Sequence, residues 1–171
     1  MFEGVESEDS PEFGDHLVTN SCKMIFLDKL VEKVRAQGDQ MIIFSNFTTM
    51  LSIIEDYCEL KEVPYCRLDG ATDLEDREAQ IEDFTSPGTD KIMFLVSTRA
   101  GGLGINLYTA NHVVLFDSDF NPQIDLQAMD RAHRIGQRKE VFVYRLICQD
   151  TVEEKIVQRQ AIKLKMDQVF I

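Results

Sequence analysis

A glycine-rich loop over residues 97–107 has the residue types of a phosphate-binding segment. It reads Ser-Thr-Arg-Ala-Gly-Gly-Leu-Gly-Ile-Asn-Leu. Its three glycines allow the backbone to approach a ligand closely, and the hydroxyls of Ser97 and Thr98 can donate to phosphate oxygens. It is neither a dinucleotide fingerprint, which needs a glycine at residue 107, nor a P-loop, since the chain has no Gly-Lys-Ser/Thr. Anion binding and a plain turn after a strand stay equal alternatives.

Residues 127–137 contain the second group of candidates. Gln127, Arg131 and Arg134 recur at i, i+4 and i+7, a spacing that predicts one face of a helix. Two guanidinium groups and an amide on one face suit a polyphosphate, because a guanidinium matches two phosphate oxygens at once. The alternative is a solvent-exposed face whose arginines pair with nearby aspartates. Composition alone favours that alternative.

The charge of the chain is unevenly distributed. Its formal net charge is -12, which excludes a nucleic-acid binder with a generally basic surface. Residues 1–20 contain six acidic and no basic residues, so they predict a solvated lead-in. Residues 127–145 contain five basic and two acidic residues. Anion binding is therefore expected there and in the neighbouring loop 97–107.

Alternating helix and strand patterns provide the elements that must position these residues. Short apolar runs indicate strands at 41–44, 65–68, 92–96, 113–116 and 141–147. Helices are expected over about 22–37, 47–61, 72–87, 121–135 and 151–169, with capping boxes at Thr72-x-x-Glu75 and Thr151-x-x-Glu154. This order predicts a parallel sheet covered on both faces. Ligands would bind beyond the carboxyl ends of its strands, at loops 45–49, 69–72, 97–107 and 117–121.

Several other classes of protein are excluded. No apolar run is long enough to cross a membrane, and the acidic start does not resemble a signal peptide. The four cysteines are widely spaced and predict reduced thiols in a cytosolic or nuclear protein, with no metal site. No complete set of catalytic residues occurs in the chain, so a partner must contribute to any reaction.

Four segments resemble motifs of the Swi/Snf-type chromatin-remodelling ATPases. The loop 97–107 is similar to motif V, residues 125–137 to motif VI, residues 42–45 to motif IV and residues 65–70 to motif IVa. The resemblance covers about residues 16–171, and the segments 16–21, 55–58 and 164–167 look most like the imitation-switch (ISWI) branch. It implies an α/β fold, a RecA-like three-layer sandwich with a mainly parallel sheet. The expected parts are the lead-in 1–20, the second RecA-like lobe 21–150 and the C-terminal helix 151–171.

The resemblance also implies roles for individual residues. Arg131 and Arg134 match motif VI arginines that act as arginine fingers on the γ-phosphate of ATP, and Gln127 would position the phosphate or the water. Gly102, Gly104 and Asn106 match the part of motif V that faces the nucleotide. The residues expected to contact the DNA backbone are Ser45, Asn46, Arg67, Asp69, Gly70, Ser97, Thr98, Arg99 and Phe120. The family usually has Trp at the position of Phe120, so an identical DNA contact is not expected.

The motor of this family has two lobes, and the chain resembles only the second. ATP with Mg would be held mainly by the first lobe, so the chain, an excised domain or a fragmentary gene product, should not hydrolyse ATP alone. Expected partners are the first lobe, double-stranded DNA, nucleosomes and accessory remodeller subunits, in the nucleus. The alternatives are the lobe of a repair or transcription translocase, and a non-catalytic lone lobe that binds DNA or a partner. For the helix 151–169, packing on the sheet is the simpler expectation, and a brace that crosses to the first lobe is the alternative.

Overall fold

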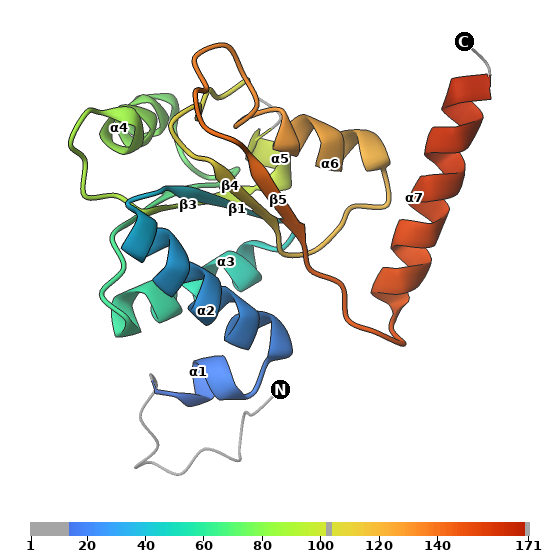
Figure 1. Cartoon of the computed structure of the whole chain (residues 1–171), viewed down its shortest axis with the longest axis horizontal. Helices are drawn as coiled ribbons and strands as arrows, with labels where there is room; N and C mark the ends of the chain where they lie inside the picture. Colours follow the sequence, from blue (N-terminus) through green and yellow to red (C-terminus); the bar gives the residue numbers. More distant parts are fainter. Residues whose placement is uncertain (1–13, 102–103, 170–171) are drawn as a thin grey trace.

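The five strands in the described part of the chain form one parallel sheet in the order β2-β3-β1-β4-β5. The structure is a computed structural model that describes residues 14–101 and 104–169 (Figure 1). The strands are β1 (Met41–Ser45), β2 (Tyr65–Leu68), β3 (Met93–Ser97), β4 (His112–Leu115) and β5 (Phe142–Arg145). The predicted parallel sheet is confirmed, and the strand ends differ from the expected ones by at most two residues.

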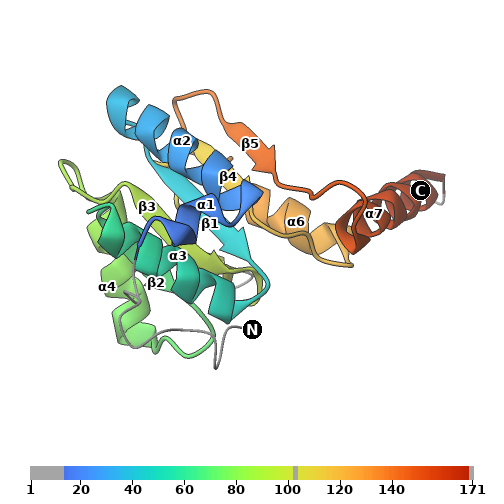
Figure 2. The ribbon, with the colours of Figure 1, turned by 90° about the horizontal axis from the view of Figure 1, so that it is seen from below.

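Helices cover both faces of this sheet. They are α1 (His16–Thr19), α2 (Cys22–Gln37), α3 (Thr48–Leu60), α4 (Leu74–Thr85), α5 (Thr98–Gly101), α6 (Pro122–Met129) and α7 (Val152–Val169). Figures 1 and 2 show α1, α2 and α3 on one face and α4, α5 and α6 on the other. None of the helices in the described ranges is long and apolar enough to cross a membrane.

The central strands are buried on both faces, which explains their continuous apolar sequences. Successive side chains of a strand point to opposite faces. Met41 and Ile43 of β1 pack with α2 and α3, whereas Ile42 and Phe44 pack in the second core, towards α4, α5 and α6. All four are fully buried. Two apolar layers therefore hold the sheet rigidly, and the loops at its ends are positioned by that scaffold.

The helix α2 begins and ends where its sequence predicts. The hydroxyl of Ser21 accepts a hydrogen bond from the backbone N–H of Met24 at 3.4 Å, so it caps the N-terminus. Gly38 follows the helix with φ of 63°, a left-handed conformation that glycine adopts without steric cost.

The predicted helix over 121–135 is wrong at its C-terminal end. Asn121 caps α6 as expected, but the helix ends at Met129. The carbonyl of Arg131 accepts from the N–H of Leu107 at 3.2 Å instead of continuing the helix, and Gly136 has φ of 111°. Gln127, Arg131 and Arg134 therefore do not share one helical face, and residues 130–137 form successive turns.

Neither predicted capping box forms with the expected pair of residues. Asp73, not Thr72, caps α4 by accepting from the N–H of Asp76 at 2.9 Å. At α7 the hydroxyl of Thr151 accepts from the N–H of Glu153 at 3.2 Å. The carboxylate that accepts from a backbone N–H ahead of this helix is that of Glu153 rather than that of Glu154. Its donor is the N–H of Cys148, at 2.7 Å.

The expectation that the last helix packs on the sheet is also wrong. In Figure 1 α7 stands apart from the face of the sheet and lies beside the start of α6. Ala161 is exposed, whereas Ile156 and Gln160 are buried. Polar contacts rather than an apolar stripe therefore attach this helix to the domain.

Candidate functional site

The loops that follow the strands gather at one edge of the sheet because all strands run the same way. Ser45 at the end of β1 and Ser97 at the end of β3 are direct partners in the strand register. The segments after β1, β3 and β4 are therefore neighbours in space although they lie far apart in the chain. This edge is the candidate site.

A buried carboxylate, Asp117, organises this edge. It accepts hydrogen bonds from the hydroxyl of Ser45 and, at 2.8 Å, from the backbone N–H of Asn46. The hydroxyl of Thr98 donates to the side-chain oxygen of Asn46. The loops after β1, β3 and β4 are thus joined by side chains. Asp117 is not among the predicted site residues. The sequence feature that points to it is its position two residues beyond a buried strand, in the loop 117–121.

The three residues 97–99 differ in exposure. Ser97 is buried and its hydroxyl accepts from the N–H of Ala100 at 3.3 Å. Thr98 is also buried, whereas Arg99 is exposed. Of these three predicted DNA contacts, the side chain that reaches solvent is that of Arg99. Ser97 and Thr98 instead shape the loop from within.

Arg67, Asp69 and Gly70 lie around the end of β2. The guanidinium of Arg67 forms ion pairs with Asp69 at 2.9 Å and with Glu55 of α3. Although partial burial opposes the effect, hydrogen bonds to these carboxylates raise the pKa of Arg67. The backbone N–H of Ala71 is the largest influence that holds the pKa of Asp69 below its usual range. The charges in this group are therefore already paired, and Gly70 is exposed beside them.

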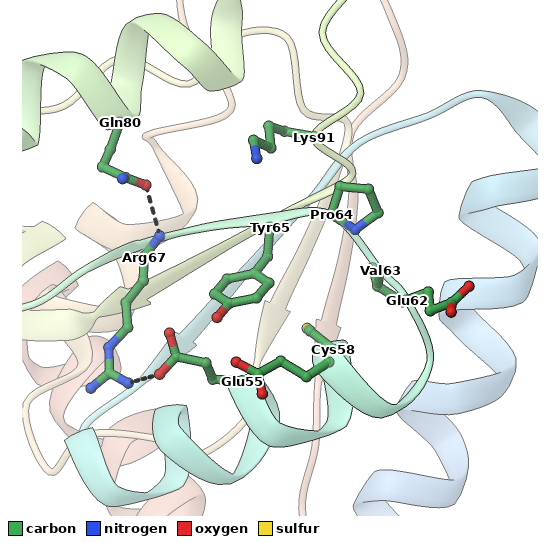
Figure 3. A pocket seen from close by; sticks show the side chains of 10 residues that line it. Glu55, Cys58, Glu62, Val63, Pro64, Tyr65, Arg67, Gln80 and Lys91 are labelled. Atoms are coloured by element: carbon green, nitrogen blue, oxygen red, sulfur yellow. Dashed lines mark hydrogen bonds and ion pairs between the residues drawn. The ribbon is translucent and has the colours of Figure 1, made fainter.

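An open pocket lies beside Arg67 on the outer edge of the sheet (Figure 3). Its volume is about 650 Å³, and Figure 3 shows Arg67 turned towards Glu55 while Gln80 contacts the backbone of Arg67. Its lining residues are Glu55, Cys58, Glu59, Glu62, Val63, Pro64, Tyr65, Arg67, Gln80 and Lys91. The pocket is lined by both acidic and basic side chains, and the motif V and VI residues do not line it.

Arg131 is a buried cation with an unsatisfied donor. Its side chain is 7 % exposed, and its Nε has no hydrogen-bond partner among the described residues. Burial lowers the pKa of Arg131, and the positive charges of Arg134 and Arg77 lower it further against the opposing effect of Asp130. A guanidinium nevertheless remains protonated at neutral pH, because its ordinary pKa lies far above that range. The structure thus concentrates positive charge around one partly desolvated guanidinium.

Arg134 joins this group to the glycine-rich loop. It is exposed, and its guanidinium donates to the carbonyl of Gly104 at 3.2 Å. Gly104 has φ of 80°, which favours glycine at this position. Asn106 is exposed nearby in sequence, and Gln127 is exposed on α6. Gly102, the remaining residue predicted to face a nucleotide, lies outside the described residues.

Two exposed aromatic rings flank a second cavity at the same edge of the sheet. Phe120 is 63 % exposed and Phe47 is 62 % exposed. The cavity between their loops has a volume of about 380 Å³ and also includes Arg99 and, from α7, Val152 and Ile156. Exposed rings beside a cation suit contacts with the sugars or bases of a nucleic acid.

A buried polar network attaches α7 to the segment that holds Phe120. The amide of Gln160 donates to the carbonyl of Asp119 at 2.5 Å and to the carboxylate of Asp125 at 2.8 Å. Its oxygen accepts from Arg145 of β5 at 2.7 Å. On the next turn of the helix, Lys163 donates to the carbonyl of Phe120 at 3.3 Å. Gln160 is not among the predicted site residues.

Comparison with known proteins identifies the family to which the chain belongs. Residues 22–136 match the family described as "Helicase conserved C-terminal domain". Over all 171 residues the chain is 54 % identical to the human "SWI/SNF-related matrix-associated actin-dependent regulator of chromatin subfamily A member 1". It is 51 % identical over the same length to the "ISWI chromatin-remodeling complex ATPase ISW2" of Saccharomyces cerevisiae. The chain spans only 16 % of the human relative and 15 % of the yeast one.

A solved structure supports the same assignment. "Crystal structure of the C-terminal part of Fun30 ATPase domain" matches 86 % of this chain and 47 % of its own, with a TM-score of 0.81 and 42 % identity. The five-stranded parallel sheet is thus the RecA-like sheet of a helicase C-terminal lobe. The chain belongs to the family of helicase conserved C-terminal domains, in the form found in SWI/SNF- and ISWI-type chromatin-remodelling ATPases.

Proposed function

We propose that this chain is the second lobe of an ATP-driven motor that translocates on double-stranded DNA and remodels nucleosomes. In this proposal Arg131 and Arg134 act as arginine fingers on the γ-phosphate of ATP. The ATP and its Mg are held mainly by a first lobe, which supplies the phosphate-binding loop that this sequence lacks. The relatives are named as chromatin-remodelling ATPases, and that supports the activity.

The observation that carries the proposal is the buried guanidinium of Arg131. An unpaired buried donor costs about 1–3 kcal/mol, so a fold that keeps one needs a compensating role. The positive charge of Arg134 acts on Arg131, and Arg134 also contacts the glycine-rich loop. An anionic group presented by another lobe would neutralise the local positive charge. Because the guanidinium is already largely desolvated, it can stabilise charge that develops on the phosphate at a low desolvation cost.

The remaining predicted residues divide between the nucleotide and the DNA. Gln127, Gly104 and Asn106 are assigned to the nucleotide, as is Gly102, which lies outside the described residues. For the DNA backbone, Arg99 supplies an exposed cation and Phe120 an exposed ring. The other residues predicted to contact DNA form two groups. Ser45, Ser97 and Thr98 are buried and shape the loops. Asn46, Arg67, Asp69 and Gly70 lie at the same edge of the sheet. Contacts to phosphate and sugar would allow movement along DNA of any sequence.

The proposal extends to the context of the whole protein. The motor would work in the nucleus on nucleosomes, with accessory remodeller subunits, and the isolated chain would not hydrolyse ATP. The hydrogen bond between Arg134 and Gly104 offers a direct route by which closure on the nucleotide could reach the loop that contacts DNA.

The test of the arginine fingers is a chimera in which this chain replaces the corresponding segment of the human relative. Replacing Arg131 with Ala should reduce DNA-stimulated ATP turnover by about a thousand-fold, the usual loss when an arginine finger is removed. The matched control is Arg138→Ala, an exposed arginine just beyond the motif VI residues, which should retain turnover within about two-fold.

Binding measurements on the same chimera separate catalysis from folding. Arg131→Ala should keep its affinity for DNA and its cooperative thermal unfolding while losing turnover. Retention of more than half of the DNA-stimulated turnover by Arg131→Ala would refute the assignment of this residue as a finger.

A further inference from the structure

Two cysteines that lie far apart in the sequence meet where α2 and α7 begin. The sulfur atoms of Cys22 and Cys148 are 3.9 Å apart, although the residues are 126 positions apart in the chain. Cys22 is the first residue of α2, and Cys148 lies in the connection between β5 and α7. Cys22 is exposed and Cys148 is half-buried, so small molecules in solvent can reach the pair.

The surrounding contacts hold these two segments together independently of the thiols. The ammonium group of Lys23 lies 2.5 Å from the carboxylate of Glu153 in α7, and it also donates to the carbonyl of Phe116 at 2.7 Å. The other oxygen of Glu153 accepts from the backbone N–H of Cys148 at 2.7 Å. Residues adjacent to both cysteines are therefore fixed in place, and the approach of the two sulfurs follows from the packing of the backbone.

The other two cysteines of the chain have different environments. Cys58 and Cys66 are buried. Burial is the main cause that raises the pKa of Cys58 to about 12 and that of Cys66 to about 11. A thiol that is both buried and protonated reacts slowly, so these residues provide an internal reference for the exposed pair.

We propose that Cys22 and Cys148 are a site of reversible oxidation, at which a peroxide converts the two thiols into an intramolecular disulfide that fastens the base of α7 to α2. The sulfurs of a disulfide are about 2.0 Å apart, so they must approach by roughly 2 Å. Rotation of the side chains can supply this movement, because both residues lie at the ends of elements and not inside the core.

The reaction balances with hydrogen peroxide as the oxidant. One thiolate attacks a peroxide oxygen, which breaks the O–O bond, gives a sulfenic acid and releases hydroxide. The second thiolate then attacks the sulfenic sulfur, which forms the S–S bond and releases a second hydroxide. Two thiols and one peroxide thus give one disulfide and two waters. A dithiol such as dithiothreitol reverses the step and becomes a cyclic disulfide itself.

The local charges predict how the reaction depends on pH. Burial and the contact with Cys22 raise the pKa of Cys148, while the positive charge of Lys23 opposes this rise and Glu153 adds to it. Since the thiolate is the reactive form, disulfide formation should be faster at pH 8.5 than at pH 7.

The test is mass spectrometry of the 171-residue chain after mild treatment with hydrogen peroxide. After alkylation of the remaining thiols, trypsin places every cysteine on a separate peptide, with Cys22 on 1–23 and Cys148 on 146–155. The expected result is a cross-link between these two peptides in the monomer and a fall from four titratable thiols to two. The midpoint temperature of thermal unfolding should rise by about 5–10 °C and return to its starting value after treatment with dithiothreitol.

Two single variants provide the control. Cys22→Ser and Cys148→Ser should fold normally, form no intramolecular cross-link and show no peroxide-dependent rise in the unfolding midpoint. If the wild-type chain keeps four alkylatable thiols, or oxidises Cys22 and Cys148 only to separate acids or to intermolecular dimers, the proposal is overturned.

Discussion

Buried polar side chains in this lobe divide into two groups. Most have hydrogen-bond partners, as folded proteins require. Asp117 and Ser45 are examples, because their side chains join two loops across the end of the sheet. Arg131 differs, since its buried Nε has no partner in the described part of the chain. In the described residues the buried side-chain atoms without a partner also include Thr109 Oγ1, Asn111 Oδ1 and Ser118 Oγ, and Arg131 is the charged residue among them.

A second buried group, His112, should make stability depend on pH. It is fully buried at the opposite end of the sheet, where its ring nitrogens contact Asp39 at 3.2 Å and Tyr144 at 3.3 Å. Burial lowers the pKa of His112 despite the nearby Asp39, and Lys33 and Lys139 lower it further. The unfolded chain therefore binds a proton more readily than the folded one. The contribution of His112 to stability is present above pH 6.5 and is lost as the pH falls through the pKa of the folded state.

Urea unfolding at pH 7.5 and pH 5.5 measures this effect. The free energy of unfolding should be lower at pH 5.5, and His112→Asn should reduce the difference between the two pH values. The control His133→Asn changes an exposed histidine and should leave the difference unchanged. Equal differences in the wild-type chain and in His112→Asn would contradict this role.

The sequence predicts the residue types of the site better than their surroundings. Arg131 and Arg134 could be singled out as candidate anion-binding residues because they lie in a basic stretch of an acidic chain, although composition alone favours an ion-paired surface. Asp117 and Gln160 could not, because their importance comes from partners that lie far away in the sequence. Whether Ser45 and Ser97 are exposed or buried likewise depends on how the loops pack.

At the scale of elements, α7 is attached differently from the other long helices. The helices α2 and α3 bury apolar faces against the sheet. In contrast, α7 is anchored by Gln160, which bridges Asp119, Asp125 and Arg145. Because Asp119 immediately precedes Phe120, a change in the position of α7 should reach the loop proposed to contact DNA.

Replacing Gln160 with Leu tests this attachment. The change leaves the fully buried carboxylate of Asp125 with fewer hydrogen bonds, which should cost about 1–3 kcal/mol. Amide hydrogen exchange should become faster over 152–169 and 117–121 while β1 and β3 stay protected. The matched control is Gln158→Leu, the same change at an exposed position of α7. If both variants exchange alike, Gln160 does not anchor the helix.

Element prediction succeeded where one local pattern dominated. The strands are short apolar runs, and the structure confirms each of them to within two residues. The end of α6 was missed because the helical spacing continues past Met129, whereas the backbone there turns to reach Leu107. The placement of α7 away from the sheet was missed because its polar anchor leaves no sequence pattern.

At the scale of the whole molecule, the lobe would form one half of the binding cleft in the motor that we propose. Its rigid sheet presents the loops and arginines at one edge, and the chain lacks a phosphate-binding loop of its own. A net charge of -12 opposes general attraction to DNA. Contacts with DNA should therefore come from a few side chains, such as Arg99 and Phe120, rather than from a basic surface.

The proposal that this chain is the second lobe of a DNA-stimulated ATPase is tested most directly by comparing the ATP turnover of three proteins with and without double-stranded DNA. They are this chain alone, the first lobe of the human relative alone, and the chimera that joins the two. We expect no turnover above background for either lobe alone and DNA-stimulated turnover for the chimera. Turnover by the isolated chain, or a folded chimera that binds ATP and DNA without hydrolysing ATP, would contradict it.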